Sequence, residues 1–423
     1  MNILMLTNTF LPHVGGVARS VQRFSEEFRR RGHRVLVVAP DYAGSAAEPD
    51  VVRVPALRNF HGSDFSVPVP ISRAVARALK TFAPEIVHSH HPYLLGDTAL
   101  RVAASRGIPA VFTHHSLYEE FTHYVPGDSP RMKRFVRDLV VGYCDLCDSV
   151  IAPSETVAGM LALRGVKGPI QVIPTGVDLG LFSGGDRAFC RARYGIPEEA
   201  FLVGHVGRLA PEKNLGFLAQ SVARFLVREE NARFLLVGDG PMREAIRRTF
   251  ESRGLSGRFH EEGVLGEAAL SHVYKGMDVF AFASRTETQG MVLTEAMAAG
   301  TPVVAIDAPG AREVVQDGKN GRLLRRENEE AFAAALSSIA ALSMEERQRL
   351  RRRVAGSVDA FSISCTADRT LALYRSLIGA QPARLAIGTG PWTAARKLLA
   401  GEWKIVRNLA RAAGTAVTTV PRD

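Results

Sequence analysis

Residues 202–237 read LVGHVGRLAPEKNLGFLAQSVARFLVREENARFLLV. In this stretch two apolar runs, 202–206 and 234–237, flank a Gly/Pro turn and a helix-like segment at 214–227. A strand, a crossover helix and a second strand in this order are typical of a parallel sheet. The two runs are apolar without strict alternation, as expected for strands that helices cover on both faces. The stretch therefore predicts a doubly wound α/β fold.

The same alternation continues on both sides of this stretch. Strand-like runs occur earlier in the chain, at residues 3–7, 34–39, 86–89, 110–113, 150–152 and 172–174, and later, at residues 279–283 and 302–306. Turn-forming residues cluster between the two series, near residues 174–185. We therefore predict two α/β domains, residues 1–178 and 179–360, each of ordinary domain size.

The composition favours a folded protein rather than a disordered or membrane-spanning one. Of the 423 residues, 46% are hydrophobic and 23% are charged. No apolar run approaches the roughly 20 residues that span a bilayer, and the first residues lack the pattern of a signal peptide. Four cysteines in so long a chain do not form a disulfide framework. These features favour a cytoplasmic protein.

Positive charge is concentrated at the C-terminal end. The whole chain has a net charge of +10, and residues 381–423 contain seven Lys/Arg and two Asp/Glu, a net charge of +5. In the predicted tail, 382–423, helical spacing puts Trp392 and Trp403 on one apolar face, with basic residues along one flank. This pattern is typical of an interfacial membrane helix. The alternative is a terminal helix that docks on the protein body.

Two glycines follow the first predicted strand, Gly15 and Gly16. Glycines between a strand and a helix allow a phosphate to approach the backbone and the helix N-terminus. A plain turn explains them equally well. The stretch does not match the G-x-G-x-x-G pattern, which argues against a nicotinamide or flavin enzyme.

Two pairs of charged residues in the second predicted domain suggest a polar ligand. Arg208 and Lys213 follow a predicted strand across a Gly/Pro turn, where two cations could hold a diphosphate. Glu287 and Glu295 are eight positions apart around Gly290, where a loop becomes a helix. A carboxylate on the buried side of a helix is costly unless it is paired, so Glu295 suggests a hydroxyl-rich ligand. The alternatives are a solvated loop and a structural ion pair.

At residues 284–302, SRTETQGMVLTEAMAAGTP, the sequence resembles the E-x7-E signature of the retaining glycosyltransferases of family 4. Further motifs stand at the places where that family has them: 207–214, 173–178, 237–241 and 318–321. The resemblance covers residues 1 to about 378. It implies the GT-B fold, an α/β architecture of two Rossmann-like domains facing across a cleft. It also implies a helix at about 361–378 that returns to the first domain.

The resemblance further implies roles for individual residues. Arg208 and Lys213 hold the donor diphosphate and stabilise its developing charge. Glu287 lies by the donor sugar, and Glu295 binds the nucleotide ribose. The remaining donor-binding residues are Gly15, Gly16, Gly290, Met291 and Val292. The family uses no well-placed protein nucleophile, no cofactor and no metal, and the adjacent histidines of residues 88–91 and 114–115 are expected to bind none.

The acceptor is suggested by the window 112–126, FTHHSLYEEFTHYVP, which looks like a run found in diacylglycerol glycosyltransferases. The resemblance implies that His115 contacts the donor sugar or supports the reaction centre. Four residues of the same window could shape an acceptor site: Tyr118, Glu119, His123 and Tyr124. The alternative is that these four form a packed cluster at the start of a helix.

A second basic segment opens the helix that follows this window. It contains Arg131, Lys133, Arg134 and Arg137 among apolar residues. Exposed cations of this kind attract anionic lipid, although a solvated helix face gives the same pattern.

The sequence as a whole predicts a retaining, metal-independent glycosyltransferase that moves a hexose from a nucleotide sugar, most simply a UDP-sugar, to a membrane lipid such as diacylglycerol. We expect it to lie peripherally on the inner face of the cell membrane and to bind an anionic membrane surface, but not nucleic acid. The main alternative is the same chemistry on a soluble or polyprenyl-linked saccharide. A basic protein that only binds membranes or nucleic acid would not need the donor motifs.

Overall fold

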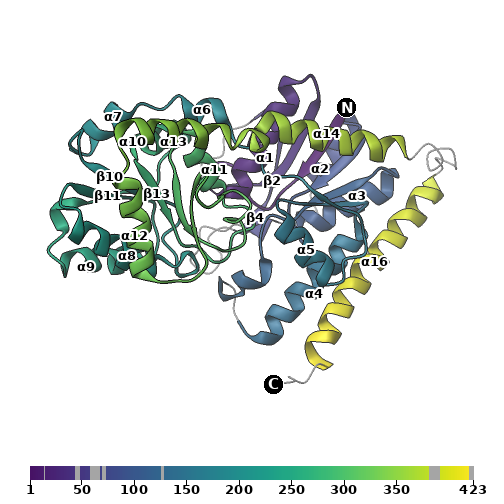
Figure 1. Ribbon diagram of the computed structural model, residues 1–423. Coiled ribbons are helices and arrows are strands. Elements are labelled where there is room, and N and C mark those ends of the chain that lie inside the picture. Colours follow the sequence, from purple (N-terminus) through teal and green to yellow (C-terminus); the bar gives the residue numbers. More distant parts are fainter. Residues whose placement is uncertain are drawn as a thin grey trace. The chain divides into compact units, whose positions relative to one another are not determined.

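The computed structural model describes residues 1–13, 15–42, 48–57, 67–68, 73–124, 128–380 and 391–418, with backbone alone at residues 67, 123, 124, 391–398, 417 and 418. The chain divides into two compact units (Figure 1). The first unit comprises Met1–Gly176 and Thr366–Asp423, and the second comprises Val177–Cys365. The division after Gly176 lies two residues before the predicted boundary at 178.

The first unit is built on a parallel sheet of seven strands in the order β3-β2-β1-β6-β7-β8-β9. These strands are β1 (Asn2–Leu6), β2 (Arg34–Pro40), β3 (Val51–Val54), β6 (Ile86–Ser89), β7 (Ala110–Thr113), β8 (Ser149–Ala152) and β9 (Ile170–Val172). A separate antiparallel pair joins β4 (Ala56–Leu57) to β5 (Val67–Pro68).

Helices cover both faces of this sheet. One face packs on α2 (Arg73–Thr81), α3 (Leu95–Arg106), α4 (Pro130–Leu146) and α5 (Glu155–Leu163). The other face packs on α1 (Gly16–Arg30) and on α14 (Ile363–Gly379), where the rings of Phe28 and Tyr374 lie 5.9 Å apart. A 3-10 helix, η2 (Tyr118–Tyr124), precedes α4. Because both faces are buried, the strands need no polar alternation.

The second unit repeats this design with six parallel strands in the order β12-β11-β10-β13-β14-β15. These strands are β10 (Phe201–Val206), β11 (Ala232–Val237), β12 (Phe259–Glu262), β13 (Val279–Phe282), β14 (Val303–Ile306) and β15 (Gly321–Leu324). The doubly wound parallel fold predicted from residues 202–237 is therefore confirmed in both units.

Two apolar clusters, one on each face, hold this second sheet between its helices. One face packs on α6 (Leu179–Ser183), α7 (Arg187–Arg193), α10 (Glu267–Gly276), α11 (Met291–Ala298) and α13 (Met344–Gly356). The other face packs on α8 (Leu215–Arg228), α9 (Arg243–Glu251) and α12 (Glu329–Ala340).

Local sequence signals explain where several helices begin and end. Ser129 caps α4 by accepting a hydrogen bond from the Met132 N–H at 3.2 Å, and Pro130 fills the first position, where no N–H is needed. Ser343 and Glu346 form a reciprocal capping box on α13. Gly107 ends α3 with a φ of 66°, a left-handed value that favours glycine.

The last long helix, α16 (Pro391–Thr418), packs along α3 and α4 and therefore belongs to the first unit (Figure 1). The sequence predicts residues 382–423 as a separate C-terminal tail. Of that segment, residues 382–390 and 419–423 lie outside the described part. In the described ranges, no helix has both the length and the apolar character to cross a membrane.

Candidate functional site

The strand ends of the second unit place the predicted donor cations. Arg208 follows β10 after Gly207, and Lys213 ends the short 3-10 helix η3 (Pro211–Lys213) that precedes α8. Gly238, at the end of the neighbouring strand β11, has a φ of 138°. A Cβ there would lie 1.9 Å from the carbonyl oxygen of Gly207. Only glycine therefore lets these two loops approach each other beside Arg208.

Each of the two cations is held by a carboxylate. The Lys213 Nζ lies 2.5 Å from Glu287 Oε1, and both side chains are mostly buried. Arg208 Nη2 lies 2.7 Å from Glu212 Oε1 nearer the surface. The structure thus brings Lys213 and Glu287 together, as the predicted donor site requires, although they are 74 positions apart. A diphosphate would compete with these carboxylates for the same N–H donors.

The helix α11 begins beside this pair. Gly290 precedes its first residue, Met291, and has left-handed backbone angles, φ 67° and ψ 58°. The first N–H groups of a helix, here those of Met291 and Val292, have no carbonyl partner within the helix and attract anionic or polar ligands. A Cβ on Gly310 would lie 2.5 Å from the Cβ of Glu287, so the missing side chain at Gly310 leaves room for Glu287.

Glu295 is buried inside the second unit, with 1% of its surface exposed. One of its carboxylate oxygens accepts a hydrogen bond from the Tyr274 hydroxyl at 3.0 Å. Tyr274 belongs to α10 and is itself fully buried. A buried carboxylate is stable only when polar partners compensate its desolvation. Tyr274 therefore orients Glu295, which the sequence predicts to bind the ribose.

A histidine that the sequence analysis did not select lies under the loop of Arg208. His205 is buried in β10 and donates from Nδ1 to the Ala281 carbonyl at 2.9 Å. Its Nε2 has no hydrogen-bond partner in the described part of the chain and would lie 3.5 Å from a Cβ on Gly207. Burial, with a smaller contribution from the positive charge of Lys213, lowers the pKa of His205 to about 4. The ring is therefore neutral at pH 7, with Nε2 as an acceptor.

The glycine loop of the first unit lies at the start of α1. Gly15 is the N-cap residue, with extended backbone angles and no side-chain cap, and Gly16 is the first helical residue. Neither glycine has a positive φ. A Cβ on Gly15 would lie 3.3 Å from His13 Nε2, closer than most real contacts. The position thus favours glycine for space rather than for backbone conformation.

His115 lies just after β7 and belongs to a network of aromatic side chains. Its Nε2 lies 2.9 Å from His90 Nδ1, and the two rings are stacked. In the same network, His88 bonds Thr113 at 2.7 Å through Nε2 and the Tyr374 hydroxyl at 2.5 Å through Nδ1. Burial holds the pKa values of His90 and His115 well below the usual range. Both rings are therefore neutral at pH 7, and one donates to the other.

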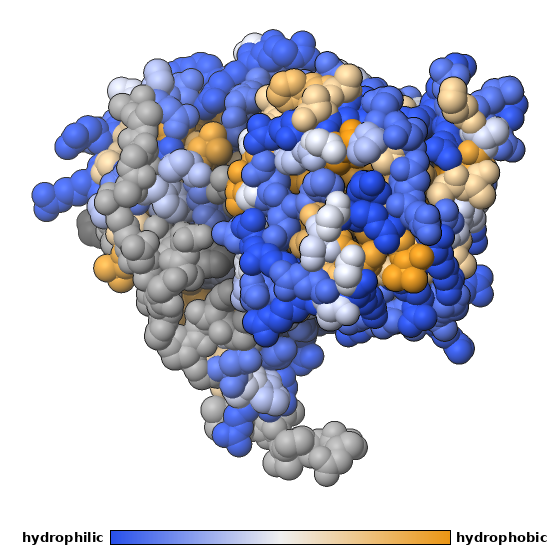
Figure 2. All heavy atoms as spheres, turned by 90° about the vertical axis from the view of Figure 1, so that its left-hand side faces the viewer, coloured by the Kyte–Doolittle hydropathy of each residue, from blue (hydrophilic) through white to orange (hydrophobic). Residues whose placement is uncertain are grey.

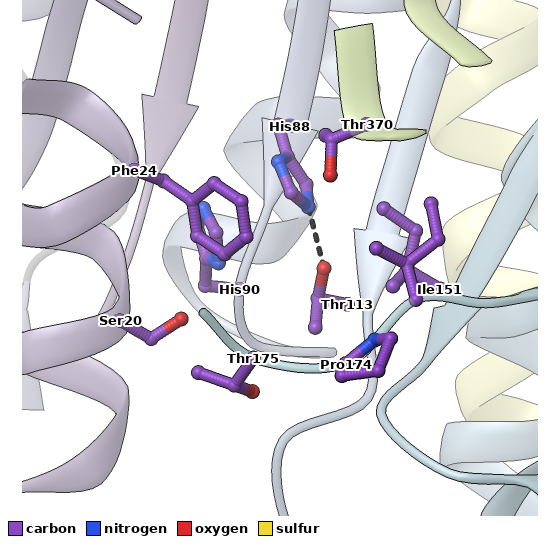
Figure 3. Close-up of a pocket in the computed structure, with 10 residues that line it drawn as sticks. Ser20, Phe24, His88, His90, Thr113, Ile151, Pro174, Thr175 and Thr370 are labelled. Atoms are coloured by element: carbon purple, nitrogen blue, oxygen red, sulfur yellow. Dashed lines mark hydrogen bonds between the residues drawn. The ribbon is translucent and has the colours of Figure 1, made fainter. Parts of the chain in front are cut away.

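A small cavity of about 10 Å³ lies beside this network (Figure 3). Two of its lining atoms, Ser20 Oγ and His90 Nε2, are buried and have no partner among the described residues. A cavity of this size holds about one water molecule. A water bonded to Ser20 and His90 would fix the ring of His90 and, through it, the ring of His115.

The predicted acceptor residues are only partly described. Tyr118 is buried, and its hydroxyl donates to the backbone carbonyl of His90 at 3.4 Å. Glu119 is also buried and forms an ion pair with Arg164. These contacts fit the alternative interpretation of a packed cluster, and acceptor contact by these two residues stays a prediction. The side chains of His123 and Tyr124 lie outside the described set.

The residues predicted to contact a membrane lie on α4 and α16. On α4, Arg131 is exposed and Arg134 is half-buried. The other two form ion pairs: Lys133 Nζ lies 3.3 Å from Glu120 Oε2, and Arg137 Nε lies 3.7 Å from Asp138 Oδ1. These two ion pairs reduce the positive charge of α4. On α16, Trp403 is 67% exposed, whereas the side chain of Trp392 lies outside the described residues.

Together, the fold and the second-unit site define a class of protein. Two parallel α/β units carry a pair of cations at the strand ends of one unit, with two carboxylates around the N-terminus of α11. This arrangement is that of a GT-B glycosyltransferase. The model of Glycosyltransferase Family 4 matches residues 14–181, and the model of Glycosyl transferases group 1 matches residues 186–355. The chain belongs to glycosyltransferase family 4.

Individual relatives agree on the family but differ in substrate. An alpha-monoglucosyldiacylglycerol synthase of Acholeplasma laidlawii is 29% identical over 345 residues, which cover 78% of this chain and 86% of the relative. A GDP-mannose-dependent alpha-mannosyltransferase of Mycolicibacterium smegmatis is 31% identical over 395 residues, 91% of this chain and 100% of the relative. The crystal structure of Anabaena HepE with UDP and glucose has a TM-score of 0.70 and 21% identity, and covers 89% of this chain and 100% of that one.

Proposed function

We propose that this glycosyltransferase moves a hexosyl group from a nucleotide sugar, in the first place a UDP-sugar, to a membrane lipid such as diacylglycerol. The observation that carries the proposal is the Lys213–Glu287 pair at the strand ends of the second unit. The similarity to an alpha-monoglucosyldiacylglycerol synthase supports the lipid acceptor. The resemblance of the 112–126 window to diacylglycerol glycosyltransferases agrees with it.

The proposed binding of the donor follows from the ion pairs. The diphosphate takes the N–H donors of Arg208 and Lys213 from Glu212 and Glu287. Glu287, released from Lys213, then accepts hydrogen bonds from the sugar hydroxyls. Charge that develops on the leaving diphosphate is stabilised by cations already in place, which is the largest contribution in many enzymes.

The remaining roles are assigned in the same proposal. Glu295, oriented by Tyr274, binds the ribose hydroxyls. His115 contacts the donor sugar as a neutral ring. We assign no protein nucleophile, and we expect retention of the anomeric configuration and no requirement for a metal ion. The enzyme acts peripherally on the cytoplasmic face of a membrane, where its acceptor lies.

The experiment is transfer from radiolabelled UDP-, GDP- and ADP-sugars into vesicles that contain diacylglycerol, with a chelator present. Label that enters the organic phase with one donor, and is lost in both Glu287→Ala and Arg208→Ala, supports the proposal. Label that reaches only water-soluble saccharides supports the alternative acceptor. Transfer from GDP-mannose alone would point to the donor named for the mycobacterial relative.

A further inference from the structure

The helix α16 packs on the first unit through one defined side, which includes both the polar Asn408 and the apolar Ile405. The residues that face α3 and α4 are Gly401, Ile405, Asn408 and Ala412, whose spacing of three and four forms one stripe of a helix. Within this stripe Ile405 is the large apolar residue, and it packs against the core of the unit. Figure 1 shows α16 lying along α4 with its other side turned away from the sheet.

Close contacts fix this orientation of α16. The Asn408 side chain donates to the Leu139 carbonyl at 3.0 Å, and a Cβ on Gly142 of α4 would lie 1.6 Å from Asn408 Oδ1. At one end of the contact, Arg101 forms an ion pair with Glu402. At the other end, the Thr415 hydroxyl donates to Asp138 at 2.6 Å. The close fit of Asn408 on Gly142, with polar contacts at both ends, favours this rotation of the helix.

The opposite side of α16 carries an exposed apolar strip, which we define as Leu399, Trp403 and Val406. These side chains are 68%, 67% and 53% exposed, and Leu409 at the edge of the strip is 50% exposed. The described part of the chain has ten exposed large hydrophobic side chains, and these four of the ten lie on α16. A helix that docked in order to bury apolar surface would turn this strip inward.

The charge beside the strip indicates what covers it. Lys404, Arg407 and Arg411 follow at helical spacing along one flank, and all three are exposed. The acidic residue of this part of α16, Glu402, is paired with Arg101. A tryptophan-containing apolar strip with a basic flank fits the boundary between anionic headgroups and acyl chains.

Exposed apolar residues of the second unit show a different distribution. Phe189, Val227, Val264 and Met344 come from separate elements. On the face drawn in Figure 2, apolar patches are small and are separated by hydrophilic surface. Scattered apolar residues of this kind are normal on soluble surfaces, so the continuous strip on α16 differs from them.

We propose that α16 is an interfacial anchor that binds a bilayer containing anionic phospholipid. The strip of Leu399, Trp403 and Val406 enters the headgroup–acyl boundary, and Lys404 and Arg407 contact the anionic headgroups. Because Asn408 and Gly142 fix the rotation of the helix, the anchor holds the first unit in one orientation on the bilayer. This inference rests on the proposed function in its choice of a bilayer as partner, and its test uses no donor and no acceptor.

The chain offers a direct reporter, because its two tryptophans, Trp392 and Trp403, are both on α16. The full-length Trp392→Phe variant leaves Trp403 as the single source of tryptophan emission. We expect its emission to shift to the blue with phosphatidylglycerol-containing vesicles and to be quenched by brominated lipids. Little change is expected with phosphatidylcholine alone, because the basic flank then has no anionic partner.

Strip and flank variants in the Trp392→Phe background test the mechanism. Leu399→Ser with Val406→Ser should lower the vesicle partition coefficient by about tenfold, since two apolar side chains no longer leave water. Lys404→Gln with Arg407→Gln should weaken binding and reduce its dependence on salt. Val227→Ser with Val264→Ser, a matched pair of exposed valines in the second unit, should change nothing. Circular dichroism verifies that each variant is folded.

The anchor is contradicted if Trp403 emission does not shift to the blue with anionic vesicles, or if the Leu399/Val406 variant partitions into vesicles as before. It is also contradicted if the emission shifts without lipid, increasingly so at higher protein concentration, and the protein then has the mass of a dimer. The last result would assign the strip to a second copy of the chain. Glycosyl transfer to diacylglycerol dispersed in detergent is measured in a separate assay, which does not depend on binding to vesicles. Vesicle binding without any transfer contradicts only the proposed function, and transfer without vesicle binding contradicts only the anchor.

Discussion

The hydroxyl of Tyr274 donates a hydrogen bond to the buried carboxylate of Glu295 and so orients it. Tyr274→Phe removes a hydrogen bond to a charged group, and such bonds contribute about 1.5–3 kcal/mol. We expect the affinity for the nucleoside diphosphate to fall by about tenfold, as measured by calorimetry with UDP and GDP. The control is Tyr194→Phe, which removes a hydroxyl that bonds Glu262 in the same unit. Equal losses in the two variants would contradict a specific role for Tyr274.

Lys213 is predicted to exchange Glu287 for the donor diphosphate. Lys213→Met removes a preorganised cation from the charge that develops in the transition state, and we expect kcat/KM to fall by about 100-fold or more. Lys275→Met is the matched control, since Lys275 is bonded to the Ser183 carbonyl on another part of the second unit. Steady-state transfer kinetics measure both. If Lys213→Met keeps kcat/KM within a fewfold of the parent enzyme, the diphosphate contact is wrong.

For individual residues, the sequence motifs predicted donor-binding side chains. They did not predict the side chains that hydrogen-bond to them. Glu287 and Glu295 belong to one recognisable string, and Arg208 and Lys213 to another. Tyr274 and His205 carry no motif, because a tyrosine in a helix and a histidine in a strand are usually core residues. Their roles follow from tertiary contacts with Glu295 and Ala281, which spacing along the chain does not reveal.

Among the elements, the contact between α4 and α16 depends on Gly142. A Cβ at this position would lie 1.6 Å from Asn408 Oδ1, so Gly142→Ala forces the two helices apart. Overpacking of this kind costs about 1–3 kcal/mol. We expect a lower free energy of unfolding in urea and faster proteolysis within α16.

The control for this experiment is Gly159→Ala on α5, where a new Cβ would meet nothing within 4 Å. There alanine should raise stability by about 0.5–1 kcal/mol through its helix propensity. A Gly142→Ala protein as stable as this control would contradict the close packing of α4 against α16.

The face through which α16 packs on α4 was hard to predict from the sequence. The hydrophobic pattern defines the face with Trp403 correctly, but two interpretations remained, membrane contact and docking on the protein body. The structure docks α16 through the opposite face, because Gly142 and Asn408 fit each other. A match between two helices that are far apart in sequence cannot be derived from the pattern of either helix alone.

At the scale of the whole molecule, buried histidines make the two units differ in acid sensitivity. Burial lowers the pKa of His88 and His91 to about 3 and that of His114 to about 4, all in the first unit. The second unit contains His205, with a pKa of about 4. Unfolded histidine has a pKa of about 6.5. Below that pH the unfolded chain therefore binds protons that the folded unit excludes.

The free energy of unfolding of the first unit should thus be fully retained above about pH 6.5. It should then decrease as the pH falls toward about 3, by up to about 1.4 kcal/mol per pH unit for each histidine. Hydrogen exchange at pH 7.5 and pH 5.5, corrected for intrinsic rates, should show a larger loss of protection in the first unit. A larger loss in the second unit would contradict this account.

The α/β alternation predicted the fold of each unit because both sheets consist of buried parallel strands with short connections, for which the apolar pattern is strong. The acceptor residues carry no comparably strong pattern, because their roles depend on which side chains the fold leaves open to a ligand. Tyr118 and Glu119 are occupied by internal contacts with His90 and Arg164.

Transfer to diacylglycerol can be measured by mass spectrometry of the lipid fraction after the enzyme is incubated with a UDP-sugar and diacylglycerol vesicles. We expect a new lipid that is heavier than diacylglycerol by one hexosyl residue and that is absent when Arg208→Ala replaces the parent enzyme. Consumption of every nucleotide sugar offered, with an unchanged lipid fraction, would contradict transfer to diacylglycerol.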